Sequence, residues 1–191
     1  MRVITGYARG MKLRTLDGLD VRPTTDQVKE SIFSIIQFEV EGARVLDLFA
    51  GSGQLGIEAL SRGAQSVVFV DKSRAAVSVV KENLEHTRLA EKAIVRNEDS
   101  LGFLKLTKDV FDIAILDPPY GQGLITEALG YLPDVMSENG IIICETAKEE
   151  TLPDTVSRFS NHKEYRYGKI KITVYRNKEN DDDQSNLSGQ F

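Results

Sequence analysis

The sequence predicts an α/β protein built on a doubly wound, Rossmann-like parallel sheet, and three observations carry this prediction. From residue 44 onward, short apolar runs typical of buried strands alternate with segments of helical periodicity. A glycine-rich turn, 51–56, joins the first of these strands to a helix. A later strand, 111–116, stops at two consecutive prolines, which cannot extend a central strand. Right-handed crossovers would bring both turns to one edge of the sheet.

The first part of the chain is expected to be an arm followed by a helix. Residues 1–23 contain strand-like pieces at 3–5 and 11–13 between glycines, which indicates a small hairpin. Thr24 as N-cap and Gln27 three residues later fit a capping box, and the apolar residues that follow recur on one helical face.

Local patterns predict the remaining elements up to about residue 177. We expect strands at 44–48, 66–70, 93–96, 111–116 and 141–144, and helices at 54–62, 73–88, 99–106 and 124–132. Alternating polar and apolar residues at 163–167 and 169–175 predict a closing antiparallel hairpin. The domain would therefore span residues 24–177, and the polar, acidic residues 178–191 are expected to be a disordered tail.

The composition excludes several classes of protein. The chain has 191 residues, of which 41% are apolar, and no apolar stretch approaches the length of about 20 residues that a membrane span needs. One cysteine and two histidines offer no metal-ligand spacing and no intrachain disulfide. Residues 1–6 lack the apolar core of a signal peptide, so we expect a cytoplasmic protein without a metal or a membrane partner.

Charge is distributed unevenly along the chain, whose net charge is −5. Residues 1–16 carry +4, from Arg2, Arg9, Lys12 and Arg14, whereas residues 178–191 carry −3. A basic arm on an acidic body is typical of a nucleic-acid-binding surface. A solvated N-terminal strand would have a similar composition, and the charge pattern alone does not separate the two interpretations.

The turn Asp117-Pro118-Pro119-Tyr120 places an acid, a rigid carbonyl and an aromatic ring just past a buried strand. This set suits a planar base with an exocyclic amine, because the carboxylate and the carbonyl can accept its two N–H bonds while the ring stacks. Pro and Asp are also ordinary turn residues, so an incidental strand-ending turn is the alternative.

Carboxylates are expected at four successive strand ends, and together they would form an acidic crevice beside the glycine turn. Asp47 suits a cationic ligand, Asp71 could accept bonds from both ribose hydroxyls, and Asp99 could accept an adenine amino group with Leu101 packed on the ring. With Asp117, this crevice fits S-adenosylmethionine better than a phosphate-bearing cofactor such as NAD. Each acid by itself could instead be a helix N-cap.

At these residues the chain resembles known proteins. Leu46-Asp47-Leu48-Phe49-Ala50-Gly51-Ser52-Gly53 followed by Asp117-Pro118-Pro119-Tyr120 resembles class I S-adenosylmethionine-dependent methyltransferases that modify exocyclic amines of bases. The patterns at 6–13 and 22–33 (Arg22-Pro23-Thr24-Thr25-Asp26 within the latter), with 56–62, resemble the RsmD family of 16S rRNA guanine-N2 methyltransferases. The resemblance covers residues 1 to about 176.

The resemblance implies a seven-stranded sheet of order 3-2-1-4-5-7-6 with the last strand antiparallel, and a ribosomal RNA substrate on an assembling small-subunit particle. It also implies S-adenosylhomocysteine as the product of the cofactor. By this likeness Asp117 to Tyr120 hold the target base. The implied cofactor residues are Asp47, Phe49, Ala50, Gly51 and Gly53 for the methionine end, Thr24 closing over it, Asp71 and Lys72 for the ribose, and Asp99, Ser100 and Leu101 for the adenine. The implied phosphate contacts are Arg9, Lys12, Arg14 and Arg22.

Methyl transfer to the N2 amine of a guanine in 16S rRNA is the function that these observations favour. The alternative within the same chemistry is an adenine-N6 methyltransferase acting on RNA or DNA, although the length of the chain weighs against a separate DNA-recognition domain. An NAD-dependent oxidoreductase would need a catalytic His, Lys or Tyr-x-x-x-Lys set, for which no candidate is found in the sequence. A non-catalytic RNA-binding module that keeps the fold is the remaining alternative.

Overall fold

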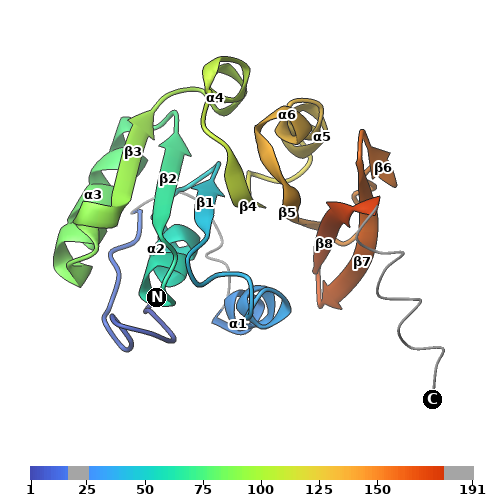
Figure 1. The fold of residues 1–191 in the computed structure, drawn as a ribbon. Helices are drawn as coiled ribbons and strands as arrows, with labels where there is room; N and C mark the ends of the chain where they lie inside the picture. Colours follow the sequence, from blue (N-terminus) through green and yellow to red (C-terminus); the bar gives the residue numbers. More distant parts are fainter. Residues whose placement is uncertain (17–25, 179–191) are drawn as a thin grey trace.

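The structure, a computed structural model, describes residues 1–16 and 26–178. One eight-stranded sheet runs through it in the order β3-β2-β1-β4-β5-β8-β7-β6 (Figure 1). The strands are β1 Arg44–Asp47, β2 Ser66–Asp71, β3 Ala93–Asn97, β4 Phe111–Leu116, β5 Met136–Ala147, β6 Thr155–Val156, β7 Phe159–Tyr167 and β8 Ile170–Asn177. The pairs from β3 to β5 are parallel, and β8 runs antiparallel to β5. The expected order is confirmed: β8 takes the place of the expected strand 7 and β7 that of strand 6, and the two-residue strand β6 is added beyond them.

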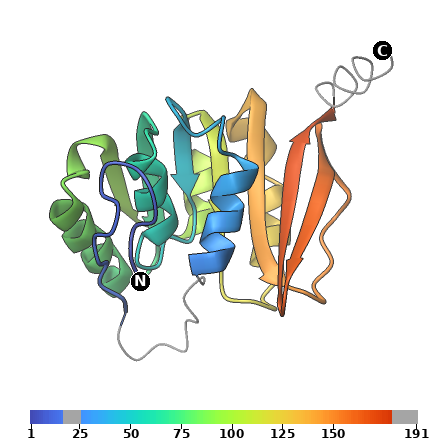
Figure 2. The same ribbon diagram turned by 90° about the horizontal axis from the view of Figure 1, so that it is seen from below.

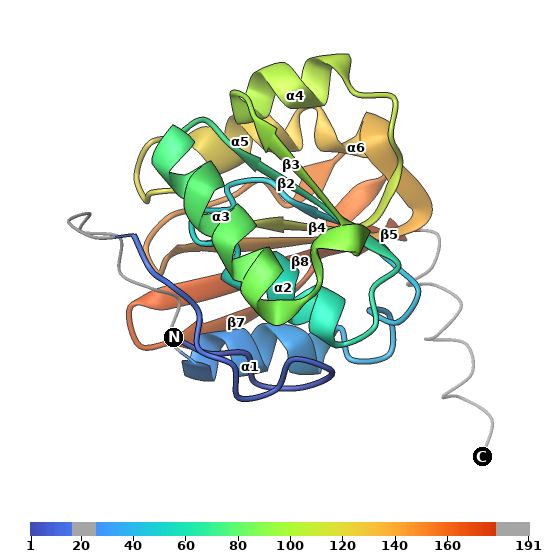
Figure 3. The ribbon, with the colours of Figure 1, turned by 90° about the vertical axis from the view of Figure 1, so that its left-hand side faces the viewer.

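Helices cover both faces of the sheet (Figure 1, Figure 3). They are α1 Asp26–Ile35, α2 Gln54–Ser61, α3 Arg74–Thr87, α4 Ser100–Leu106, α5 Leu124–Leu129 and α6 Leu132–Val135, with a 3₁₀ turn at Ala90–Lys92. The first three pack into one core cluster and the last three into another on the opposite face. In the described part of the chain, none of the helices has the length and apolar character that crossing a membrane requires.

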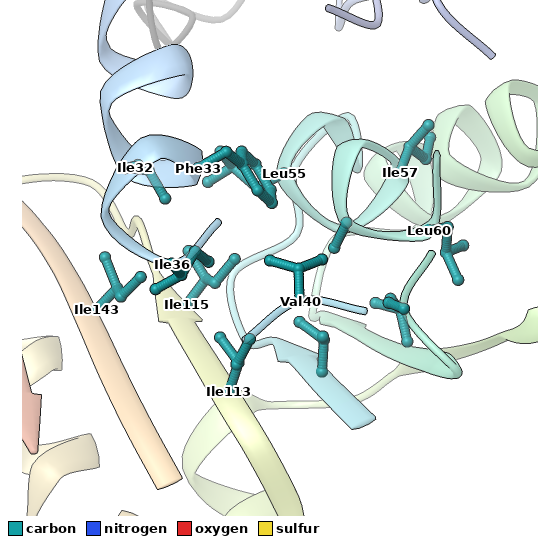
Figure 4. Packing of buried hydrophobic residues seen from close by; sticks show 14 of the residues in the cluster. Ile32, Phe33, Ile36, Val40, Leu55, Ile57, Leu60, Ile113, Ile115 and Ile143 are labelled. Atoms are coloured by element: carbon teal, nitrogen blue, oxygen red, sulfur yellow. The ribbon is translucent and has the colours of Figure 1, made fainter. Parts of the chain in front are cut away.

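Strand burial explains why the sequence pattern is continuous rather than alternating in the centre of the sheet. Ile113 and Ile115 of β4 face the cluster under α1 and α2, while Ala114 and Leu116 face the cluster under α4 to α6. In Figure 4, Ile36, just past the end of α1, lies close to Ile115. A strand buried on both faces needs apolar residues at every position, and residues 113–116 meet this requirement.

One predicted helix and one predicted central strand differ clearly from those in the structure. The helix expected at 124–132 is two short helices, because the Gly130 N–H bonds the Glu127 carbonyl and closes α5, and Pro133 opens α6. The strand expected at 141–144 is longer and begins at Met136, which pairs with Phe111 across an irregular register. At its other end, antiparallel pairing with β8 extends the strand through the polar residues Glu145 and Thr146, which an apolar pattern does not assign to a strand.

The N-terminal arm folds against α2 instead of forming two regular strands (Figure 2). Within residues 1–16, its only isolated strand bridge is between Arg2 and Lys12, while the Ile4 and Thr5 N–H groups donate to the carboxylate of Glu58 at 2.8 and 3.0 Å. The strands predicted at 3–5 and 11–13 are therefore replaced by a looped arm held by a helix side chain. The proposed N-cap Thr24, the proposed phosphate contact Arg22 and the predicted disordered tail from residue 179 onward lie outside the described residues.

Candidate active site

Three carboxylates gather where neighbouring parallel strands end. Asp47 is the last residue of β1, Asp71 is the last residue of β2, and Asp117 directly follows β4. Strand β1 lies between β2 and β4, and all three run in the same direction, so these side chains meet at one edge of the sheet. Three of the acids expected at strand ends thus lie on adjacent strands at the topological switch point, where open α/β sheets bind ligands.

Asp47 is the most deeply buried of these acids, with 3% of its surface exposed. Its pKa is raised to about 7, chiefly by burial and in part by the nearby charges of Asp117 and Asp71, while a hydrogen bond from the Gly56 N–H at 2.9 Å opposes the shift. A bound cation beside this carboxylate would stabilise its ionised form. The crevice is therefore suited to a positively charged ligand and unsuited to a phosphate.

The glycine turn has the backbone that its sequence requires. Gly51 and Gly53 adopt positive φ angles of 53° and 77°, which glycine tolerates at little cost. Gly56 is needed for packing, because a Cβ on it would lie 2.2 Å from Cε1 of Phe69. The third glycine therefore lets α2 approach β2 closely, as in nucleotide-binding βα turns.

Hydrogen bonds join the loops that follow β1 and β2. Oδ2 of Asp71 accepts from the Gly51 N–H at 2.9 Å, and Oδ1 accepts from the Ser73 N–H at 2.8 Å. The Ala50 N–H donates to the Val70 carbonyl at 3.0 Å. These contacts hold Asp71 against the glycine turn, next to the half-buried Phe49.

The loop after β3 is attached to the same edge. Asp99 is the N-cap of α4, and its Oδ1 accepts from the Gly102 N–H at 2.9 Å. The buried Ser100 hydroxyl donates to the Leu48 carbonyl at 2.8 Å, which ties the start of α4 to the end of β1. Leu101 is half-buried against the core and Lys72 is exposed. For Asp99 the N-cap interpretation is correct, and its second oxygen has no protein partner in the described part of the chain.

The Asp-Pro-Pro-Tyr turn projects from the same edge next to β5. Pro118 is buried, Pro119 is exposed, and 41% of Tyr120 is exposed. The Tyr120 hydroxyl donates to Oε1 of Glu145 at 2.7 Å. Glu145 follows Cys144, the partner of Leu116 in the β4–β5 register, so its backbone lies beside that of Asp117. The aromatic ring is therefore anchored at its hydroxyl to the neighbouring strand.

The basic side chains of the arm lie at the surface, and one of them contacts α3. Arg9, Lys12 and Arg14 are exposed. Arg14 pairs with Glu82, and its backbone exchanges two hydrogen bonds with the buried side chain of Asn83, at 2.7 and 3.0 Å. Asn83 also donates to the Ser52 carbonyl at 2.9 Å, so one side chain contacts both the arm and the glycine turn.

Comparison with known proteins places the chain in a family. The family profile described as "Conserved hypothetical protein 95" matches residues 1–176. The chain belongs to this family. The "Ribosomal RNA small subunit methyltransferase D" of Haemophilus influenzae is 36% identical over 182 residues, covering 93% of this chain and 94% of that protein. The protein of the same name from Escherichia coli K12 is 35% identical and covers 92% of this chain and 89% of its own length.

Solved structures agree with this family assignment. The Escherichia coli protein yhhF superposes with a TM-score of 0.81 at 35% identity, covering 93% of this chain and 97% of its own. Methyltransferase is therefore the enzyme class of this family member. Among residues 1–16 and 26–178, no group of three or more His, Cys, Asp or Glu side chains is arranged to hold a metal ion.

Two residues at this edge were not identified from the sequence. Glu145 directly follows the strand predicted at 141–144, although β5 itself continues to Ala147. An acid directly after a predicted strand, the pattern that indicated the other acids, was the available signal for Glu145. Gln54, the first residue of α2, is 7% exposed, and its Oε1 is buried without a hydrogen-bond partner in the described chain. A polar residue inside the glycine turn was the available signal for Gln54.

Proposed function

We propose that this family member transfers a methyl group from S-adenosylmethionine to the exocyclic N2 amine of a guanine in small-subunit ribosomal RNA. The observation that carries the proposal is the single edge at which the buried Asp47, the glycine turn and the Asp-Pro-Pro-Tyr turn meet. The names of the relatives from Haemophilus influenzae and Escherichia coli support the ribosomal substrate.

The residues present fit this cofactor. The ammonium and sulfonium groups of the cofactor are cationic. Burial raises the pKa of Asp47, and a cation next to this carboxylate would stabilise its ionised form. The orphaned Oε1 of Gln54 adds a buried acceptor beside Gly53 that an ammonium N–H could satisfy. Unlike a phosphate, neither cationic group would be repelled by the three strand-end acids.

Each loop would then hold one part of the cofactor. We assign the methionine end to the β1 loop, the ribose to the β2 end and the adenine to the start of α4. The residues are Asp47, Phe49, Ala50, Gly51, Gly53 and Gln54 for the methionine end, Asp71 and Lys72 for the ribose, and Asp99, Ser100 and Leu101 for the adenine. Thr24 stays a sequence-based candidate for closing the methionine end. When bound, the cofactor supplies an electrophilic methyl group on sulfur and leaves as S-adenosylhomocysteine.

The Asp-Pro-Pro-Tyr turn would hold the target base. The N2 amine is a poor nucleophile because its lone pair is delocalised into the ring. Hydrogen bonds to Asp117 and to the Pro118 carbonyl would favour a tetrahedral nitrogen, with Pro119 stiffening the turn. Positive charge develops on that nitrogen during transfer, so these fixed acceptors stabilise the transition state more than the ground state. Tyr120, anchored to Glu145, would stack on the flipped base.

The arm would contact the RNA backbone. Arg9 and Lys12 are exposed and, in the described chain, form no ion pair, so both can meet phosphates. Arg14 would add a third contact once its pair with Glu82 opens, and Arg22 is a further candidate from the sequence. We also propose that the RNA is presented on an assembling small-subunit particle, since a single domain of this size offers few base-reading elements of its own.

Adenine-N6 transfer is the alternative chemistry, since the same turn can hold either exocyclic amine. The experiment incubates the chain with isotopically methyl-labelled S-adenosylmethionine and small-subunit rRNA from a strain that lacks the modification. The RNA is then digested to nucleosides for mass spectrometry. Label in N2-methylguanosine supports the proposal, and label in N6-methyladenosine supports the alternative. Label in neither, with the free rRNA and with small-subunit particles from the same strain alike, contradicts both.

A further inference from the structure

A groove of about 610 Å³ lies between the arm and the C-terminal end of α3, away from the strand-end acids. Tyr7 and Met11 line it from the arm, and His86, Arg88 and Lys92 line it from the end of α3 and the turn that follows. Helix α3 starts next to Asp71 and is 14 residues long. The groove therefore lies roughly 20 Å from the crevice, at the opposite edge of the sheet.

Tyr7 is presented rigidly, although 85% of its surface is exposed. Its N–H donates to the Ser61 carbonyl at 2.8 Å, and the neighbouring Ala8 N–H donates to the Ser61 hydroxyl at 3.0 Å. Gly6 has a φ of 84°, and a Cβ on it would lie 1.7 Å from the Ser61 carbonyl oxygen. This close turn fixes the backbone of an exposed aromatic ring that contributes little to the core, a combination typical of a stacking platform.

Arg88 occupies a backbone position that favours glycine. It caps the C-terminus of α3 with φ 59° and ψ 34°, in the left-handed region that L-residues enter at a cost. Glycine would relieve that cost, so the arginine side chain needs another reason to be present. Strained residues of this kind are found where a side chain serves binding.

The groove is positively charged and continuous with the basic arm. Of the described residues that line it, none is acidic, and neither Arg88 nor Lys92 forms an ion pair within residues 1–16 and 26–178. The acids Glu85 and Glu91 are nearby in sequence but do not line it. Arg9 and Lys12, close in sequence to the lining residue Met11, are also exposed.

We propose that this groove binds a single-stranded segment of the ribosomal RNA substrate. One unpaired base would stack on Tyr7, and phosphates on either side would contact Arg88 and Lys92. An aromatic ring beside cations, without acids in the lining, is the combination that single-stranded nucleic acid recognises. This inference rests on the proposed function, and it adds a second contact region that positions the RNA while the target base is held at the far edge.

Arg88→Gly provides the sharpest test, because it removes the charge and relieves the backbone. Its melting temperature should equal or exceed that of the wild type. Affinity for naked, undermodified small-subunit rRNA should fall roughly five-fold at 0.1 M salt, and the log–log salt slope should flatten by about 0.7. Arg88→Lys keeps the charge and should bind normally. Arg166→Ala, which removes an exposed charge from β7 near the other edge of the sheet, should also bind normally.

Tyr7 gives an independent pair of variants. Tyr7→Ala should weaken binding roughly tenfold, and Tyr7→Phe should retain the wild-type affinity because the stacking face remains. Phe38→Ala, at an equally exposed aromatic outside this groove, is the matched control and should have no effect.

If Arg88→Gly and Tyr7→Ala both kept the wild-type RNA affinity and salt slope, the proposal that this groove binds RNA would be wrong. A defect seen only with ribonucleoprotein particles and absent on naked RNA would also overturn it, because it would point to a protein contact. Failure of the proposed function gives a different result, in which the wild-type chain itself transfers no methyl group either to this RNA or to undermodified small-subunit particles at saturating concentrations.

Discussion

The hydroxyl of Tyr120 donates a hydrogen bond of 2.7 Å to the carboxylate of Glu145, a side chain that is 2% exposed. The bond joins the turn after β4 to the neighbouring strand β5. It therefore sets the angle of the ring that we assign to base stacking, and it makes Glu145 a positioning residue for Tyr120.

Because of this bond, we expect removal of the Tyr120 hydroxyl to lower the rate of methyl transfer. Tyr120→Phe keeps the stacking face but leaves a buried carboxylate without this donor, so kcat should fall several-fold while cofactor affinity stays unchanged. Glu145→Gln still offers an acceptor and should be milder. If the two residues act through one bond, the double variant should be less impaired than the summed free-energy losses predict. Additive effects in single-turnover assays would show that they act separately.

The raised pKa of Asp47 predicts a pH-dependent cofactor affinity. A cationic ligand binds best to the ionised carboxylate, and the pKa of this group is about 7 in the free protein. Affinity for S-adenosylmethionine should therefore rise between pH 6 and pH 8, with proton release on binding at pH 6. Calorimetry in two buffers of different ionisation enthalpy measures that proton. Asp47→Asn should bind weakly at every pH without proton release, and an unchanged pH profile in this variant would remove Asp47 from the ligand contacts.

The same pKa shift affects folding in the absence of cofactor. The folded-state value of about 7 exceeds the unfolded value of about 3.9, so the folded chain binds more protons between these limits. Asp47 therefore lowers the free energy of unfolding as pH rises from about 4 to about 7. Denaturant titrations of Asp47→Asn should show a smaller decline over this window than those of the wild type.

The close approach of α2 to β2 predicts the effect of a single methyl group. Gly56→Ala would place Cβ 2.2 Å from the ring of Phe69, which is fully buried and cannot move aside. The free energy of unfolding should fall by roughly 1–3 kcal/mol. Gly102→Ala in α4, whose Cβ would meet only atoms 3.6 Å or more away, should be neutral or stabilising by up to about 1 kcal/mol. Equal stabilities for the two variants would refute the packing explanation.

The buried carboxylate of Glu58 predicts a loss of order confined to the arm. Glu58 accepts from the backbone of Ile4 and Thr5, bonds Arg62 at 2.8 Å, and lies 3.9 Å from Nζ of the fully buried Lys29. Glu58→Gln removes the charge and should cost about 3 kcal/mol. Amide exchange should accelerate at residues 4 and 5, and RNA affinity should fall while cofactor affinity is kept.

Glu82→Gln is the matched control for Glu58, because Glu82 pairs with the exposed Arg14 at the surface. It should change stability by no more than about 1 kcal/mol. If Glu58→Gln left amide exchange in the arm at wild-type rates, the arm would be held by other contacts.

The sequence was sufficient for features that depend on neighbouring residues. Buried strands with acids at their ends and a glycine turn are local patterns, so Asp47, Asp71 and Asp117 could be placed before the structure. Glu145 and Asn83 could not, because their roles come from pairing between β4 and β5 and from the arm folding onto α3. The arm was assigned regular strands because its alternation does not reveal that Glu58 takes two of its N–H bonds.

The central claim is that Asp117 accepts a hydrogen bond from the target amine in the transition state. The most direct test is the single-turnover rate of methyl transfer to undermodified small-subunit rRNA at saturating cofactor, for the wild type, Asp117→Ala and Asp117→Asn. We expect Asp117→Ala to bind cofactor and to lose roughly 10²-fold or more in rate. Asp117→Asn should keep part of the activity, because one acceptor oxygen remains. A wild-type rate in Asp117→Ala would contradict the account.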